Sequence, residues 1–348
     1  LPNVYPGYQK VVEEKNQRKF EAAWGVPLSP RLGKTATELV PGILEGTTSA
    51  LYVMAENPIM SEPDTNHVRK SFEQLDFMVL QEIFLTETAL YADVLLPGVS
   101  FAEKTGTFTN TERRVQMIAP VISPLGDSKP DWQITAEIAR RMMAKRDANQ
   151  DAPFVGWDYQ SPAEILDEAA ALTPIYGGIN HARILAGERI QWPCTGTEHP
   201  GTPILHVGKF ARGLGKFHAV DYIPPAEQPD EDYPFVMSTG RVLYHWHGGE
   251  MTRRTNGLNK IYGEAMVEIN PEDAEKLGAT DESYLDITSR RGTIKARAWV
   301  TERVPPGMVY TNFHFPVSSA NILTQAVLDP IAKIPEYKVT AVRVERVK

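Results

Sequence analysis

The spacing of apolar residues divides the first part of the chain into short strands separated by helices. Apolar runs within residues 49–54, 76–84 and 92–96 predict three buried strands. Residues 65–75, between the first two runs, have the apolar spacing of a helix. Strands that alternate with helices indicate an α/β fold with a doubly wound parallel sheet.

Further helices are predicted where helical spacing coincides with a start signal. Thr35, followed three residues later by Glu38, is a capping-box pattern, and Ser161 before Pro162 is the usual start of a helix. The predicted helices cover residues 13–24, 35–44, 133–144 and 161–172.

From residue 218 onward the pattern changes to short strands with regular turns, which favours a small barrel. Gly292 lies in a turn typical of a hairpin, and Asn270 begins a short helix. The predicted strands cover residues 233–237, 265–269, 284–288, 293–300 and 309–313. We therefore expect an α/β domain over residues 1–150, a connecting segment over 151–217 and a β-rich domain over 218–348.

Residues 238–254 carry the most informative chemistry. They read S-T-G-R-V-L-Y-H-W-H-G-G-E-M-T-R-R and follow a predicted strand. A turn of small residues exposes backbone N–H groups that can bind an anion. Arginine guanidinium groups, which donate paired hydrogen bonds, together with aromatic rings suit a large, flat anion such as a nucleotide pyrophosphate.

This stretch has two alternative interpretations. His245 and His247 could form a metal pair, but no third ligand lies nearby and Cys194 is distant, so no zinc site is expected. A solvated loop of charged residues is the other alternative, which the interleaved Tyr244 and Trp246 disfavour.

Three polar residues follow the predicted strands of the sheet. Ligands of parallel sheets bind beyond the carboxyl ends of the strands, which places Asn57, Gln81 and Glu82 at the ligand edge. Glu82 could bond a ribose or a guanine edge, or it could be a helix cap or a solvated carboxylate. No G-x-G-x-x-G is present, so the usual NAD or FAD fingerprint is missing.

Residues 101–116 form a second polar stretch, F-A-E-K-T-G-T-F-T-N-T-E-R-R-V-Q, for which we expect a loop with a half-buried polar network. Arg113 and Arg114 are expected to be structural ion-pair partners. Asp131 lies at the start of a predicted helix, where its default role is the N-cap. Cys194 is expected to be inert, or at most an accessible thiol.

Composition narrows the function. The net charge of -8 over 348 residues argues against a nucleic-acid partner. A single cysteine leaves no disulfide framework and no cysteine-rich iron–sulfur motif. No apolar run approaches the roughly 20 residues that span a bilayer. The chain opens with neither a signal peptide nor an initiator methionine, so it looks like a piece of a longer protein or a processed product.

Several stretches resemble one enzyme family. T-G-R-V-L-Y-H-W-H-G is similar to the guanine-dinucleotide-binding loop of the molybdopterin oxidoreductases, and residues 101–116 resemble that family's E-K-x-G-x-x-x-N-x-E-R-R motif. L-P-N-V-Y-P-G-Y-Q, A-E-N-P, I-Q-W-P-C and P-E-Y-K resemble the alpha subunit of molybdenum- or tungsten-dependent formate dehydrogenases. The resemblance runs from Leu1 to Lys348 and covers the C-terminal part of the family's chain.

The resemblance implies a six-stranded double-psi β-barrel after the α/β domain. It also implies a bis-molybdopterin guanine dinucleotide carrying molybdenum or tungsten, at which formate is reversibly oxidised to carbon dioxide. The residues expected to bind this cofactor are Asn57, Gln81, Glu82, Lys104, Asp131, Thr239, Gly240, Arg241, Val242, Leu243, Tyr244, His245, Trp246, His247, Gly248, Phe313, Asn321 and Lys338. Phe313 could instead belong to the barrel core.

The same resemblance implies that the groups reacting at the metal lie upstream. No catalytic and no metal-ligating residue is therefore expected here, and 4Fe–4S clusters are expected only in the part of the subunit outside this chain. The expected partners are the N-terminal catalytic half of the subunit and iron–sulfur or NAD-linked electron-transfer subunits, in the cytoplasm. A nitrate reductase of the same superfamily and a non-catalytic cofactor scaffold stay open as alternatives.

Overall fold

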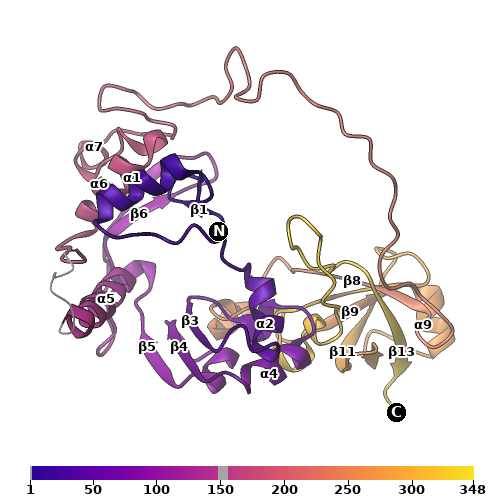
Figure 1. The fold of residues 1–348 in the computed structure, drawn as a ribbon. Coiled ribbons are helices and arrows are strands. Elements are labelled where there is room, and N and C mark those ends of the chain that lie inside the picture. Colours follow the sequence, from indigo (N-terminus) through magenta and orange to yellow (C-terminus); the bar gives the residue numbers. More distant parts are fainter. Residues whose placement is uncertain (1, 148–155) are drawn as a thin grey trace. The chain divides into compact units, whose positions relative to one another are not determined.

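The structure is a computed structural model, and it describes residues 2–147 and 156–348. The chain forms two compact units (Figure 1). One comprises Leu1–Lys34 and Leu96–Val220, and the other comprises Thr35–Leu95 and Asp221–Lys348. Each unit is thus assembled from two separate stretches of the chain. The domain limits at residues 150 and 217 stay a prediction.

The first unit is built from helices and two small antiparallel sheets. Trp24 of α1 donates to the carboxylate of Glu168 in α6 at 3.0 Å, and Trp24 also packs on Phe20. A second cluster buries Ile179, Ile190 and Cys194 together with part of β7. The elements of this unit are β1 (Val4–Tyr5), β2 (Gln9–Lys10), α1 (Glu14–Trp24), η2 (Phe101–Glu103), β6 (Gly106–Thr109), β7 (Val115–Ile118), α5 (Asp131–Asp147), α6 (Pro162–Leu172), η3 (Pro174–Tyr176) and α7 (His181–Leu185).

Part of the polar stretch 101–116 is not the expected loop. Gly106 pairs with Ile118, so β6 and β7 form an antiparallel hairpin whose tip carries the charged residues. Arg114 forms the expected ion pair, with Glu112 at 2.8 Å. Arg113 also has a structural role, but its guanidinium donates to backbone carbonyls, one of them that of Thr202 at 2.9 Å.

The structure excludes one of the alternative roles given above for each of two residues in this unit. Asp131 is the first residue of α5 and therefore not its N-cap. Cys194 is fully buried, which excludes an accessible thiol and agrees with an inert one.

The second unit contains the predicted parallel sheet. β3 and β4 pair in parallel, from Ala50 opposite Phe77 to Met54 opposite Gln81, and β5 continues the sheet. The capping box of Thr35 and Glu38 is present at the start of α2. The elements around this sheet are α2 (Ala36–Leu44), β3 (Ala50–Met54), α3 (Pro58–Ser61), α4 (Thr65–Phe72), β4 (Phe77–Glu82), η1 (Glu87–Tyr91) and β5 (Val94–Pro97).

Six strands of the described chain close into a barrel in the order β10-β11-β9-β12-β8-β13. β8 runs parallel to β12 and β9 parallel to β11, while the other neighbours are antiparallel. The expected six-stranded barrel is therefore confirmed. Its elements are β8 (Phe235–Gly240), η4 (Thr252–Arg254), α8 (Asn256–Ile261), β9 (Met266–Ile269), α9 (Pro271–Leu277), β10 (Tyr284–Thr288), β11 (Thr293–Val300), β12 (Met308–Asn312), η5 (Pro316–Ser318), η6 (Ala320–Ile322) and β13 (Thr340–Arg346).

The barrel core is aliphatic and follows the alternation of the strands. Leu285 and Ile287 on β10 and Ile294 on β11 are at most 1% exposed, whereas their sequence neighbours face outward. Burial of this alternating face holds the barrel closed, and β8, one of its strands, ends at Gly240.

Candidate functional site

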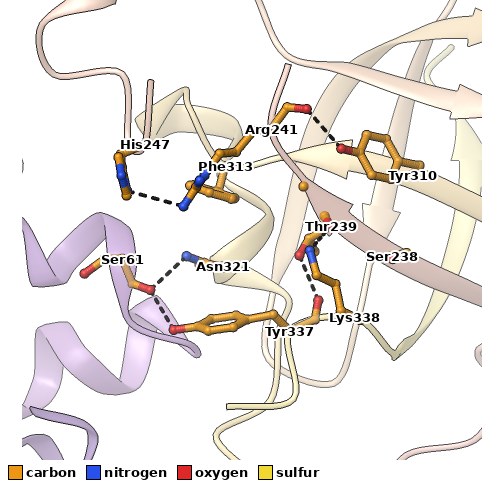
Figure 2. A pocket seen from close by; sticks show the side chains of 11 residues that line it. Ser61, Ser238, Thr239, Arg241, His247, Tyr310, Phe313, Asn321, Tyr337 and Lys338 are labelled. Atoms are coloured by element: carbon orange, nitrogen blue, oxygen red, sulfur yellow. Dashed lines mark hydrogen bonds between the residues drawn. The ribbon is translucent and has the colours of Figure 1, made fainter. Parts of the chain in front are cut away.

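The carboxyl end of β8 opens onto a cavity of about 730 Å³ within the second unit (Figure 2). Four separate segments supply its walls: the end of α3, the end of β8 with the loop that follows, β12 with the segment after it, and the segment before β13. Seven predicted cofactor-binding residues line it: Thr239, Gly240, Arg241, His247, Phe313, Asn321 and Lys338. Phe313 is consequently a wall residue and not part of the barrel core.

Hydrogen bonds hold these walls together. The ammonium of Lys338 donates to the carbonyl of Thr239 at 2.6 Å, and the Thr239 hydroxyl donates to the carbonyl of Tyr337 at 2.8 Å. On the opposite wall the Tyr337 hydroxyl donates to the carbonyl of Ser61 at 2.8 Å. Figure 2 shows these hydrogen bonds among the residues that line the cavity.

Positive charge at the cavity is not neutralised within the described residues. Arg241 contacts Nδ1 of His247 at 3.4 Å, and Lys338 contacts only backbone oxygen, so neither cation is paired with a carboxylate there. A cavity lined by two such cations is suited to an anionic ligand.

One buried polar atom at this cavity lacks a partner. Asn321 is 2% exposed, and its amide nitrogen donates to the carbonyl of Met60 at 2.7 Å. Its Oδ1 atom has no hydrogen-bond partner among the described residues. An unsatisfied buried acceptor is costly, so this atom is positioned for a donor supplied by a ligand or water.

A second cavity, of about 410 Å³, shares Ser61, His247 and Phe313 with the first. Asn57, Glu82, Trp246 and Gly248 from the predicted set line it. Its floor is ordered by Asn57, whose amide nitrogen donates to Glu250 at 2.8 Å and to Glu87 at 2.9 Å.

Val242, Leu243 and Tyr244 border a third cavity of about 580 Å³ on the barrel. His245 lines none of the three, because its ring points into the barrel end. Its Nε2 lies 2.6 Å from the carbonyl oxygen of Tyr262 and its Nδ1 lies 3.1 Å from the Thr252 hydroxyl.

Three further predicted residues are not among those that line these cavities. Gln81 is buried at the end of β4, where it accepts a hydrogen bond from the hydroxyl of Tyr52. Lys104 and Asp131 belong to the first unit and form an ion pair with each other at 2.5 Å. A role for these three in cofactor binding stays a prediction.

Matches to known proteins agree with this geometry. Residues 235–341 match the model described as "Molydopterin dinucleotide binding domain", and residues 17–141 match "Molybdopterin oxidoreductase". Over its whole length the chain is 44% identical to an F420-dependent formate dehydrogenase subunit alpha of Methanocaldococcus jannaschii. It is 42% identical to F420-dependent formate dehydrogenase 1 subunit alpha of Methanococcus maripaludis.

The chain belongs to the molybdopterin oxidoreductase family. It spans 50% of the length of both relatives and is homologous to formate dehydrogenase alpha subunits. A solved structure of acetylene hydratase from Pelobacter acetylenicus shares the fold, with a TM-score of 0.68 over 95% of this chain and 50% of that one. The sequence identity to it is 14%, so this likeness concerns the fold alone.

The described residues fit a molybdopterin dinucleotide, the ligand class of this family. The cavity offers unneutralised cations for phosphate, the unsatisfied Oδ1 of Asn321 for a donor, and the ring of Phe313 for stacking. Gly240 permits the close approach of the Tyr310 hydroxyl to the cavity wall, since a Cβ atom there would lie 2.0 Å from that hydroxyl.

Residues missed from the sequence complete the site. Ser61, Tyr310 and Tyr337 line the first cavity, and Glu250 lines the second. His314 is fully buried beneath the loop. Tyr337 and Glu250 carried a signal, because they lie within the P-E-Y-K stretch and residues 238–254 quoted above.

In residues 2–147 and 156–348 no group of three or more His, Cys, Asp or Glu side chains could hold a metal ion. No helix of the same residues is long and apolar enough to cross a membrane.

Proposed function

We propose that this chain is the cofactor-holding C-terminal part of a formate dehydrogenase alpha subunit. In the complete enzyme formate is reversibly oxidised to carbon dioxide at molybdenum or tungsten held by two molybdopterin guanine dinucleotides. The observation that carries the proposal is the convergence of seven predicted residues on one cavity with two unneutralised cations. The names of the two methanogen relatives support the reaction class.

In this proposal, different residues of the cavity bind different parts of the dinucleotide. Arg241 and Lys338 supply positive charge for the pyrophosphate, and arginine can do so with two parallel hydrogen bonds. Phe313 supplies a stacking face, and Asn321 supplies an acceptor for a ring N–H or a hydroxyl. The bound metal centre supplies the redox chemistry, while this chain binds and orients the dinucleotide.

The ion pair between Lys104 and Asp131 remains a proposed second contact region. Both side chains are partly exposed, at 23% and 31%, so the pair can rearrange toward a ligand at small cost. Gln81 is buried and hydrogen-bonded, which makes it a supporting residue behind Glu82 in this proposal.

Catalysis and electron transfer require partners in this proposal. The groups that react with formate and the first iron–sulfur cluster lie in the rest of the subunit. Electrons leave through iron–sulfur subunits to NAD or, by analogy with the names of the methanogen relatives, to F420. We expect no formate oxidation by this chain alone, and turnover by the isolated chain would contradict the division of roles.

The test measures acid-released GMP and metal in the native assembly that contains this chain. About two GMP per molybdenum or tungsten are expected for a bis-dinucleotide centre, and Arg241→Ala with Lys338→Ala should lower both contents. Arg343→Ala, at an exposed position on β13 of the same barrel, is the matched control and should retain them. Absence of both GMP and metal from the parent assembly would favour a non-catalytic scaffold.

A further inference from the structure

A layer of buried rings lies beneath residues 241–248, which we call the dinucleotide loop. His245 is 4% exposed, and its ring packs edge-on against Phe315 with centroids 5.2 Å apart. His314 lies beside them, 5.7 Å from the His245 ring, and is fully buried. The loop is thus supported from inside the barrel end by side chains that do not line its cavities.

His314 bonds to both ends of the loop. The backbone N–H of Val242 donates to Nε2 of His314 at 2.9 Å, and Nδ1 of His314 donates to the carbonyl of His247. A backbone N–H can only donate and a carbonyl can only accept, so the hydrogen must reside on Nδ1. Both bonds therefore require the neutral ring in this one tautomer.

The protein keeps the ring neutral. The pKa of His314 is lowered to about 4, mainly by burial and in smaller part by the charges of Arg241 and Arg253, while the bond to the His247 carbonyl acts in the opposite direction. A second proton on the ring would remove the acceptor that Val242 uses.

Few other bonds hold the first half of the loop. The amide of His245 reaches the carbonyl of Val242 at 3.4 Å, a long contact. The second half is better held, since the Gly249 amide donates to the Trp246 carbonyl at 2.8 Å. Between these bonds Leu243 and Trp246 are 92% and 61% exposed. The backbone of the first half is therefore held by His314 at Val242 and by the Tyr310 hydroxyl at the Arg241 carbonyl, at 3.2 Å, while the side chain of His245 anchors its end.

The bond from His314 to the His247 carbonyl stabilises a residue with a strained backbone. His247 has a φ of 46°, a left-handed conformation that residues other than glycine rarely adopt, and it is costly unless its surroundings hold it. The bond from His314 to its carbonyl holds this peptide, and the ring of His247 then lies 3.4 Å from the guanidinium of Arg241.

We propose that His314 is a positioning residue that sets the shape of the dinucleotide loop by bonding the Val242 amide and the His247 carbonyl at once. It acts through Arg241 and His247, which line the cavity, and does not itself touch a ligand. This inference rests on the proposed function for its ligand, a guanine dinucleotide.

The experiment uses the full chain and GDP as the probe, with affinity measured by calorimetry. His314→Gln keeps an acceptor near the position of Nε2, His314→Asn keeps a donor near that of Nδ1, and His314→Ala keeps neither. Each lost bond is expected to weaken GDP binding by up to about tenfold, and His314→Ala should be weakest. Val344→Ala, which opens the barrel core on β13 away from the loop, should lose stability and keep its affinity for GDP.

A second readout separates failure of this proposal from failure of the proposed function. Nitrogen NMR should show His314 protonated on Nδ1, and hydrogen exchange at the Val242 amide should accelerate in His314→Asn but much less in His314→Gln. If the parent binds GDP and His314→Ala binds it equally well, the positioning role is wrong. If the parent does not bind GDP, the proposed function is in doubt, while the ring tautomer and the Val242 exchange rates still decide the loop clamp.

Discussion

Glu62 is the residue whose substitution tests the energetics of the second unit most directly. It follows α3 and lines a small cavity of about 110 Å³ together with apolar side chains such as Val40 and Val68. Its carboxyl group has no hydrogen bond or ion pair among the described residues. Burial, with a contribution from the charge of Glu56, raises the pKa of Glu62 to about 7 from an ordinary value of 4.5.

The raised pKa determines how stability depends on pH. Between pH 4.5 and about 7 the folded state keeps the Glu62 proton that the unfolded state has released. The free energy of unfolding therefore falls by about 1.4 kcal/mol for each pH unit gained in this window. Over the whole window this amounts to roughly 3 kcal/mol, an upper value because the side chain is partly exposed to solvent.

His314 has the opposite dependence. Its pKa is lowered from 6.5 to about 4, so the unfolded state takes up a proton first as the pH falls through this range. Stability from the neutral ring is present above pH 6.5 and is lost toward pH 4. Between about pH 4.5 and 6.5 the contributions of Glu62 and His314 to stability oppose each other. The stability of the parent should therefore change less with pH than that of a variant lacking either side chain.

Glu62→Gln is expected to leave the free energy of unfolding nearly unchanged at about pH 4.5 and to raise it by roughly 2–3 kcal/mol near pH 7.5. Urea unfolding of parent and variant, followed by circular dichroism at each pH, measures the difference, in which the other carboxylates cancel. Glu73→Gln, at an exposed position after α4, is the matched control and should show no such trend. Equal stabilities of parent and Glu62→Gln at every pH would refute the buried-carboxyl reasoning.

Three further predictions concern both units. Gly178→Ala places a Cβ atom 2.0 Å from the carbonyl oxygen of Gly196, so the free energy of unfolding of the first unit should fall by about 1–3 kcal/mol. Limited proteolysis should then cleave this unit faster, and an unchanged rate would show that the backbone shifts without cost. Arg241→Lys keeps the charge but loses the planar fork, so GDP binding should weaken by roughly tenfold in calorimetry, and equal affinity would argue against bidentate phosphate binding. Because the ion pair of Lys104 and Asp131 is partly exposed, a double-mutant cycle with Lys104→Met and Asp131→Asn should give a coupling free energy of about 0.5–1 kcal/mol in stability. A coupling well above that range would mean that the pair is shielded from solvent.

Local patterns predicted most elements of this fold. The capping box of Thr35, the parallel strands β3 and β4 and the hairpin of β10 and β11 depend on residues close together in sequence, and all are present. β13 was not predicted, because a strand that closes a barrel pairs with β8 and β10 far away in the chain and shows no local sign of this. The hairpin of β6 and β7 was also missed, since its polar composition is typical of a loop.

The sequence alone determined the family, the loop motif and seven residues that share one cavity. Only the tertiary structure decided how the two histidines of H-W-H divide their roles, with His245 turned into the barrel end and His247 lining the cavity. The same holds for His314, which reaches Val242 across 72 positions of sequence. Burial, charge and unsatisfied atoms arise from contacts between distant segments, and no spacing along the chain encodes them.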